Sequence, residues 1–183
     1  MEKFFLERES AAVLIIDIQE RLAAAMQEKE SVVRNCQHLI ELSAMMGIPI
    51  LLTEQYPKGL GRTVPEIRES LPTYAPLEKM TFSCCEEHSF LHEVQRTGRK
   101  ILLLTGMETH ICVLQTCLGL LREGFTVHIV RDAVCSRTKA NGKTGLEFMR
   151  DAGAVITCTE TALFQLLKTA GTEEFKAISK RIK

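Results

Sequence analysis

The sequence predicts an α/β protein built on a doubly wound, six-stranded, mainly parallel sheet with helices on both faces. Short runs of β-branched and other apolar residues alternate with longer amphipathic stretches along the chain. These short runs are apolar at consecutive positions, which is typical of parallel strands buried on both faces. Right-handed crossovers between such strands place helices on both sides of the sheet.

Six short apolar runs are the predicted strands, and the third is the weakest of them. In chain order they are Ala12–Asp17, Ile48–Thr53, Leu77–Lys79, Ile101–Thr105, Thr126–Val130 and Ala154–Thr157.

The amphipathic stretches between these runs predict five helices. They are Ser31–Met46, Cys84–Arg96, His110–Arg122, Gly142–Asp151 and Thr161–Lys168. Glycines at or just beyond the ends of the first four indicate C-terminal caps. Ser83 and Glu86 have the spacing of a capping box at the start of the second helix.

One long stretch without a clear period, Glu54 to Pro76, holds four of the five prolines. A loop of this length within a compact domain is often functional. We therefore expect it to form a lid or a pocket wall, or to contact a neighbouring subunit.

Length and composition predict a single domain over residues 1–183. With 45% apolar and 25% charged residues, the chain can bury one substantial core. Lys plus Arg and Asp plus Glu are equal at 23 each, and no long run of one sign occurs. We therefore expect a small-molecule substrate, with no nucleic acid and no membrane as partner.

The cysteine content and the N-terminus favour a reducing, cytoplasmic location. The seven cysteines are odd in number and irregularly spaced, and MEKFFLERES carries acids where a signal peptide carries bases. Apolar segments such as Ala11 to Ile16 are much shorter than the roughly 20 residues that span a bilayer.

Three chemically active residues lie at the carboxyl ends of predicted strands: Asp17 and Lys79 end their strands, and Cys112 follows the strand Ile101–Thr105 by one turn. Ligands of open α/β sheets gather at the carboxyl ends of the strands, so these side chains converge on one pocket if their strands are neighbours. A thiol in the first turn of a helix lies beside free N–H groups and the positive end of the helix dipole, which favour thiolate. Asp17 can take the thiol proton, and Lys79 can stabilise negative charge. The backbone N–H groups around Cys112 can form an oxyanion hole.

Each of these residues also has a structural interpretation. Cys112 can be a small buried apolar residue, Asp17 a helix N-cap and Lys79 a solvated surface lysine.

The chain from about Ala12 to Leu167 resembles the isochorismatase-like cysteine hydrolases, a superfamily that includes nicotinamidases, N-carbamoylsarcosine amidohydrolase-type enzymes and isochorismatases. Five pieces match in order: VLIIDIQ, LEKMTFSC, GMETHICVLQT, VRDAVCSR and AGAVITCTETALFQLL. The resemblance implies a catalytic triad of Asp17, Lys79 and Cys112. It also implies a cis peptide bond between Met107 and Glu108, which aims backbone N–H groups at the oxyanion.

The resemblance implies further site residues and a mechanism. The N–H groups of Glu108 and Cys112 would form the oxyanion hole, and a thioester would form on Cys112 during cleavage of an amide-type or related C–N bond. The proposed substrate pocket comprises Gln19, Tyr56, Phe82, Met107 and His110, chosen by their proximity to the motifs. Related folds commonly assemble through apolar helices, so a homo-oligomer is expected.

This sequence differs in two ways from better-known members of the superfamily, and both differences limit the activities that the resemblance implies. Nicotinamidases carry an Asp and His metal motif after the second strand, where this chain reads LLTEQYPKGLG, so no metal and no cofactor are expected. Isochorismatases of the enterobactin type lack the cysteine. The resemblance therefore predicts a hydrolase without naming its substrate. The alternative is a catalytically weak member that serves as a binding or scaffold module.

Two further motifs are weak. Cys84, Cys85, His88 and His92 have zinc-ligand chemistry, but adjacent cysteines rarely form a good tetrahedral pair. Asn141-Gly142-Lys143-Thr144 resembles the end of a phosphate-binding loop, but Arg137 stands where that motif requires its first glycine.

Overall fold

The computed structural model describes residues 1–182 and contains one six-stranded sheet in the order β3-β2-β1-β4-β5-β6. Every neighbouring pair of strands is parallel, which confirms the predicted fold class. The strands are β1 (Ala11–Ile16), β2 (Ile50–Gln55), β3 (Leu77–Lys79), β4 (Ile101–Met107), β5 (Thr126–Cys135) and β6 (Val155–Thr157).

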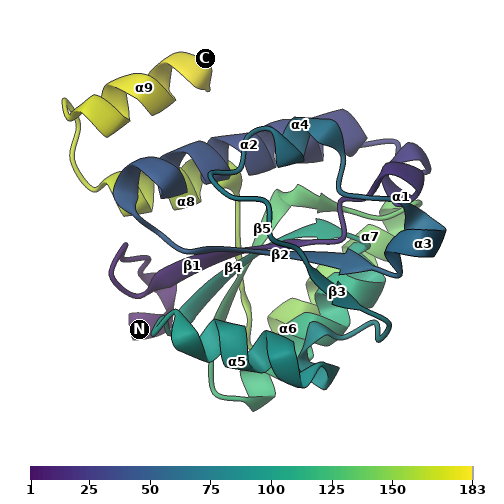
Figure 1. Cartoon of the computed structure of the whole chain (residues 1–183). Helices are drawn as coiled ribbons and strands as arrows, with labels where there is room; N and C mark the ends of the chain where they lie inside the picture. Colours follow the sequence, from purple (N-terminus) through teal and green to yellow (C-terminus); the bar gives the residue numbers. More distant parts are fainter. Residues whose placement is uncertain (183) are drawn as a thin grey trace.

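Helices cover both faces of this sheet (Figure 1). One face carries α2 (Lys29–Met46), α8 (Thr159–Leu167) and α9 (Glu173–Arg181), and the other carries α5 (His88–Arg96), α6 (Leu114–Arg122) and α7 (Lys139–Asp151). The remaining short helices are η1 (Glu2–Phe4), α1 (Glu20–Ala24), α3 (Pro57–Leu60), α4 (Pro65–Arg68), η2 (Cys84–Glu86) and the π-helix η3 (Thr109–Val113).

Strand β1 shows why the apolar runs lie at the centre of the sheet. All six of its residues are buried, and alternate side chains enter the two apolar clusters on opposite faces. Val13 and Ile15 belong to the cluster under α2, whereas Leu14 and Ile16 belong to the cluster under α6. A strand with this double burial needs apolar residues at consecutive positions, as the sequence shows.

The strand order changes one expectation about the site. Strands β1 and β4 are neighbours, but β2 separates β1 from β3. The strands that end near Asp17, Lys79 and Cys112 are therefore not all adjacent, and the side chain of Lys79 reaches Asp17 across the end of β2.

Two predicted helices are divided in the structure. The predicted helix Cys84–Arg96 breaks at Glu87, whose backbone is extended with φ −96° and ψ 113°. The Ser83 hydroxyl accepts a hydrogen bond from the Cys85 N–H at 3.3 Å and caps the 3-10 helix η2, so the predicted capping box with Glu86 is wrong. The predicted helix His110–Arg122 begins as the π-helix η3 before α6.

The stretch 54–76 is more regular than expected. It contains the end of β2 and the two short helices α3 and α4, each of which has a proline at its first position. Proline is well suited to that position, because its missing N–H has no intrahelical partner there and its φ is already helical. Within residues 1–182, no helix combines the length and apolar character needed to cross a membrane.

Gly106 allows β1 and β4 to approach closely beneath the site. Its φ is +118°, and an added Cβ would lie 2.0 Å from the carbonyl oxygen of Ile16. We expect Gly106→Ala to lower the free energy of unfolding by about 2–5 kcal/mol, because strain and overpacking add. Urea denaturation measures this loss.

Gly98→Ala is the matched control, since Gly98 has φ +67° and an added Cβ would meet nothing within 4 Å. This variant is expected to lose only about 1–2 kcal/mol from the backbone conformation. Equal losses in the two variants would contradict the close approach at Gly106.

Candidate active site

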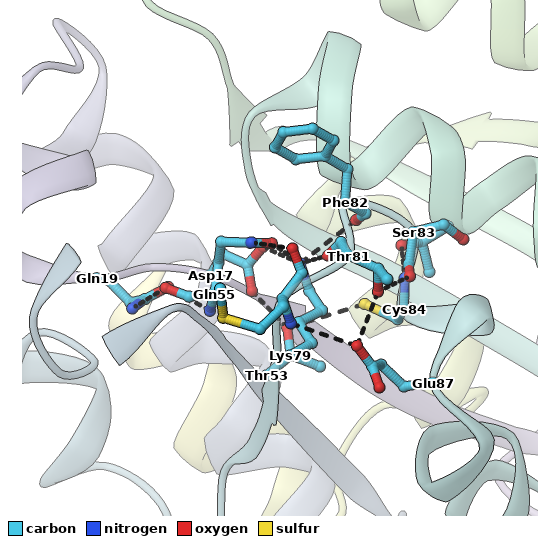
Figure 2. A network of polar contacts seen from close by, with 12 residues as sticks. Asp17, Gln19, Thr53, Gln55, Lys79, Thr81, Phe82, Ser83, Cys84 and Glu87 are labelled. Carbon is cyan, nitrogen blue, oxygen red and sulfur yellow. Dashed lines mark hydrogen bonds and ion pairs between the residues drawn. The ribbon is translucent and has the colours of Figure 1, made fainter. Parts of the chain in front are cut away.

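Asp17 and Lys79 form a buried ion pair at the carboxyl edge of the sheet (Figure 2). Lys79 Nζ lies 2.7 Å from Asp17 Oδ2, and the side chains are 2% and 0% exposed respectively. Asp17 follows β1 directly and has a positive φ of 53°, a conformation that asparagine and aspartate tolerate better than most residues. A strained backbone of this kind is common at functional sites.

Residues of β2 fix both members of the pair. The Thr53 hydroxyl donates a hydrogen bond to Asp17 Oδ1 at 2.7 Å, so each carboxylate oxygen has a donor. Lys79 Nζ also donates to Gln55 Oε1 at 2.7 Å. Neither Thr53 nor Gln55 is a predicted site residue, although the change from apolar to polar residues at the end of β2 is visible in the sequence.

The surroundings of Lys79 favour its charged form. The carbonyl oxygens of Thr81 and Phe82 lie 3.2 and 3.3 Å from Nζ. Burial acts to lower the pKa of Lys79, but the charge of Asp17 and the nearby thiols outweigh it, and the net shift is upward. The site therefore holds an ammonium group beside Asp17.

Cys112 lies in η3 and is 5% exposed. It is close enough to Asp17 and Lys79 for both charges to affect its pKa. Burial, with a smaller contribution from Asp17, raises the pKa of the Cys112 thiol to about 12, although Lys79 opposes the shift. The expectation that a helix start stabilises thiolate is therefore wrong for this site. Desolvation and the neighbouring carboxylate both favour the neutral form, so the resting group is a thiol.

Acidity does not distinguish Cys112 from the other buried cysteines. Burial also raises to about 12 the pKa values of Cys36, Cys84, Cys85, Cys117 and Cys135. Cys84 is a second thiol beside the pair, with Sγ 4.0 Å from Thr53 Oγ1, but it is completely buried. Of the two thiols beside Asp17 and Lys79, Cys112 is the one whose residue is not completely buried, at 5% exposed against 0% for Cys84.

The segment before Cys112 is held by its own carboxylate. The peptide bond between Met107 and Glu108 is cis. The Glu108 carboxylate accepts hydrogen bonds from the Arg137 N–H at 2.9 Å and from Arg137 Nε at 3.1 Å. Among residues 1–182 the Glu108 N–H has no hydrogen-bond acceptor, so it is available to a ligand. The oxyanion-hole role of Glu108 and Cys112 stays a prediction.

Two of the predicted pocket residues have structural roles. Gln19 is buried, and its amide donates to the carbonyl oxygens of Gln55 at 2.9 Å and Gly61 at 2.7 Å. Both amide hydrogens are thus used to fix the chain beyond β2. The Met107 side chain is fully buried in the apolar cluster under α2, which places it in the core and not in a pocket wall.

The side chains of the other three pocket candidates lie in different surroundings. The ring of Phe82 extends away from the polar network in Figure 2 and is 55% exposed. Tyr56 is exposed and lies against Gly59, where an added Cβ would be 2.3 Å from its ring. His110 Nδ1 contacts Ser136 Oγ at 2.9 Å, toward the start of α7. Their roles as substrate contacts stay predictions.

The four possible zinc ligands do not converge. Cys84 and Cys85 are buried, whereas His88 and His92 are exposed. Throughout the part of the chain that the structure describes, no group of three or more His, Cys, Asp or Glu side chains has the arrangement of a metal site.

A second buried carboxylate, Glu54, fixes the stretch 54–76 next to the site. Glu54 Oε1 accepts hydrogen bonds from the Thr63 N–H and hydroxyl, both at 2.7 Å, and from the Tyr74 hydroxyl. Arg62 pairs with Glu54 Oε2 at 3.4 Å. Burial acts to raise the pKa of Glu54, but these hydrogen bonds and the Arg62 charge outweigh it and lower the pKa below its usual value.

The lowered pKa of Glu54 predicts an acid-sensitive loop. A carboxylate whose folded-state pKa is depressed stabilises the protein above its unfolded pKa of about 4.3, and that contribution is lost as pH falls through the folded value. We expect the free energy of unfolding to decline below about pH 4.5 and Glu54→Gln to flatten this decline, at a cost of about 1–3 kcal/mol at neutral pH. Urea denaturation at several pH values tests this.

Glu78→Gln is the matched control, since Glu78 is an exposed partner of Arg62. Its pH profile should follow the wild type. Identical profiles for Glu54→Gln and the wild type would contradict the role of Glu54.

The doubly wound parallel sheet with a polar cluster at its carboxyl edge defines the class of open α/β proteins, in which this edge is the usual place for ligands. Within that class, the model of the isochorismatase domain family matches residues 11–161. The chain therefore belongs to the isochorismatase family and has its hydrolase fold.

The similarity to known relatives extends over nearly the whole chain. The secreted isochorismatase effector Isc1 of Phytophthora sojae is 40% identical over 178 residues, covering 95% of this chain and 85% of that protein. The MAR1 ribonuclease structure from Caenorhabditis elegans has a TM-score of 0.90 and 33% identity, covering 97% and 92% of the two chains. YcaC from Pseudomonas aeruginosa, solved with hexane-2,5-diol and covalent acrylamide, has a TM-score of 0.90 and 27% identity, covering 97% and 91%.

Proposed function

We propose that this chain is a cysteine hydrolase that cleaves a small amide-type or related C–N bond through a thioester on Cys112. The observation that carries the proposal is the buried Asp17–Lys79 pair, 2.7 Å apart, beside the thiol of Cys112. Burying two charges is costly unless their geometry is well satisfied, and here Thr53 and Gln55 complete the set of hydrogen bonds. Such a costly arrangement at the carboxyl edge supports a catalytic role.

In the first half-reaction, Asp17 accepts the proton of Cys112 as the sulfur attacks the substrate carbonyl carbon. The resting thiol requires this coupled proton transfer, since burial disfavours a free thiolate. Lys79 and the N–H groups of Glu108 and Cys112 stabilise the tetrahedral oxyanion. The C–N bond then breaks, Asp17 returns its proton to the leaving amine, and a thioester remains.

In the second half-reaction, Asp17 takes a proton from water as the oxygen attacks the thioester carbonyl carbon. The C–S bond breaks, the sulfur recovers the proton from Asp17, and the acid product leaves. Thr53 holds Asp17 in place for both transfers through its hydrogen bond to Oδ1.

The proposed active form is a homo-oligomer in the cytoplasm with a small-molecule substrate. Large apolar side chains follow β2 and β3 at the rim of the site, with Tyr56, Met80 and Phe82 exposed by 46%, 66% and 55%. Covering this rim with a second subunit would exclude water from the thioester. Light scattering at micromolar concentration measures the mass, and a value of 20.6 kDa would contradict the oligomer.

Amine release from a panel of small amides and N-carbamoyl compounds, with RNA assayed in parallel, tests the proposed function. We expect turnover of at least one C–N substrate by the wild type and its loss in Asp17→Asn. Hydrolysis of RNA alone would overturn the C–N specificity. Saturable binding of panel compounds without turnover would favour the binding or scaffold module.

A further inference from the structure

A cleft of about 390 Å³ lies beside the proposed active site, between α2, the end of β5 and α7. This volume is within the range of about 300–1,000 Å³ typical of small-molecule sites. Its polar lining includes the hydroxyl-bearing residues Ser31, Thr109, Ser136 and Thr138. Cys112, Asp17 and Lys79 do not line it, so the cleft is separate from the triad.

The N-terminal turns of two long helices border this cleft. Ser31 of the 18-residue α2 and its N-cap Glu28 line one wall, and Lys139 of the 13-residue α7 and its N-cap Thr138 line another. In α7, Thr138 caps only the Asn141 N–H, and across residues 1–182 the N–H groups of Lys139 and Ala140 have no acceptor. Free N–H groups and aligned helix dipoles favour a bound anion.

Thr109 provides an independent observation at the same place. It lines the cleft and is 1% exposed, and its Oγ1 has no hydrogen-bond partner among the described residues. Leaving a hydroxyl buried without a partner costs about 1–3 kcal/mol. A polar ligand that reached Oγ1 from the cleft would satisfy this group.

Gly142 keeps a further part of the cleft open. A glycine within a helix costs about 1 kcal/mol relative to alanine, so it usually has a packing reason. Gly145, one turn later, has that reason, because an added Cβ would lie 2.9 Å from His110 Cα. Gly142 does not, since an added Cβ would meet only Ser136 at 3.8 Å, and Gly142 lines the cleft.

Basic side chains around the cleft are available to bind an anion, because the acidic side chains there have other partners. Its two acids are engaged: Glu28 pairs with Lys139 at 3.7 Å, and Asp132 Oδ1 accepts two hydrogen bonds from Thr159 at 2.8 Å. Arg131 has no ion-pair partner within residues 1–182, and Lys143 has only an exposed contact with Glu147 at 3.8 Å.

We propose that this cleft binds the oxyanion group of a small molecule, a phosphate or a carboxylate, at the N-termini of α2 and α7. Lys139 and Ala140 would donate backbone N–H groups, Thr109 its hydroxyl, and Lys143 with Arg131 positive charge. Thr109 is the residue next to Glu108 in the chain, so a bound anion would lie beside the segment that precedes Cys112.

Titration of the ¹⁵N-labelled full chain with inorganic phosphate, at ionic strength held constant with NaCl, tests the site, and acetate in a second series tests the carboxylate. We expect saturable shifts at the N–H groups of Thr109, Lys139 and Ala140. Lys143→Gln and Thr109→Val should each weaken binding at least about fivefold. The anion that binds identifies the group recognised.

Two comparisons separate binding from folding effects. Thr109→Val should keep or raise the thermal midpoint of unfolding, because it removes an unpartnered buried hydroxyl. The same variant should lower the affinity for the anion. Lys180→Gln is the matched control, on the exposed surface of α9 at the other end of α2. Absence of saturable shifts with both anions, or equal affinities of Lys143→Gln, Thr109→Val and Lys180→Gln, would overturn the proposal.

Discussion

Replacing Cys112 with alanine should reduce kcat for amine release by at least about three orders of magnitude, since the step that forms the C–S bond is lost. The substitution removes one buried sulfur and leaves Asp17 in contact with Thr53 and Lys79. The fold should therefore persist, and circular dichroism with a thermal scan checks this. Steady-state amine release on the best panel substrate measures the effect.

Cys84→Ala is the matched control for this prediction. Cys84 is also a buried thiol beside the pair, and its pKa is raised by burial and by Asp17. It lies on η2 and is completely buried, so it has no path to a substrate. We expect this variant to keep at least about a tenth of the wild-type rate. Equal losses in the two variants would contradict the assignment of Cys112.

Replacing Lys79 with methionine should lower the free energy of unfolding by about 3–5 kcal/mol, because the Asp17 carboxylate stays buried without its cation. The Asp17–Lys79 pair is almost inaccessible to water, so solvent screening reduces this loss of stability very little. The double variant Asp17→Asn with Lys79→Met should recover a large part of this stability, because no unpaired charge remains. Urea denaturation of the wild type, both single variants and the double variant completes the cycle.

An exposed ion pair gives the comparison for this cycle. Lys176 and Glu173 lie 2.7 Å apart on α9, with side chains 57% and 83% exposed. Lys176→Met is expected to cost no more than about 0.5 kcal/mol, as is usual for such pairs. If Lys79→Met cost as little as Lys176→Met, the buried pair would not exist in solution.

The sheet was predictable because burial on both faces leaves a strong pattern in the sequence. Each predicted strand overlaps an observed one, and β3 matches at both ends. The order of the strands in the sheet was harder to predict, because an apolar run does not indicate which other strand it pairs with. The position of β2 between β1 and β3 explains why Thr53 and Gln55 enter the site.

The local helix rules failed where distant residues decide the backbone. Ser83 and Glu86 fit a capping box in sequence, but η2 packs closely on α6, where Gly119 leaves only enough room for Cys85. The stretch 54–76 looked irregular because Glu54, Thr63 and Tyr74 form their hydrogen bonds only in the folded chain.

The site shows the same limit. The motifs located Asp17, Lys79 and Cys112, and the structure brings Asp17 and Lys79 into contact with Cys112 beside them. The helix-start rule predicted a thiolate, but it considers only local dipoles, whereas burial and Asp17 determine the pKa of Cys112. Proximity in sequence also overestimated the pocket, since the side chain of Met107 enters the core.

Mass spectrometry of the protein during turnover tests whether a thioester forms on Cys112. The wild-type chain, mixed with the best panel substrate and quenched in acid within milliseconds, is digested and its peptides are mapped. We expect an added acyl mass on the peptide that contains Cys112, absent from the six other cysteines and lost after treatment with hydroxylamine. Turnover without acylation of Cys112, or with the acyl group on another residue, would contradict the proposed thioester.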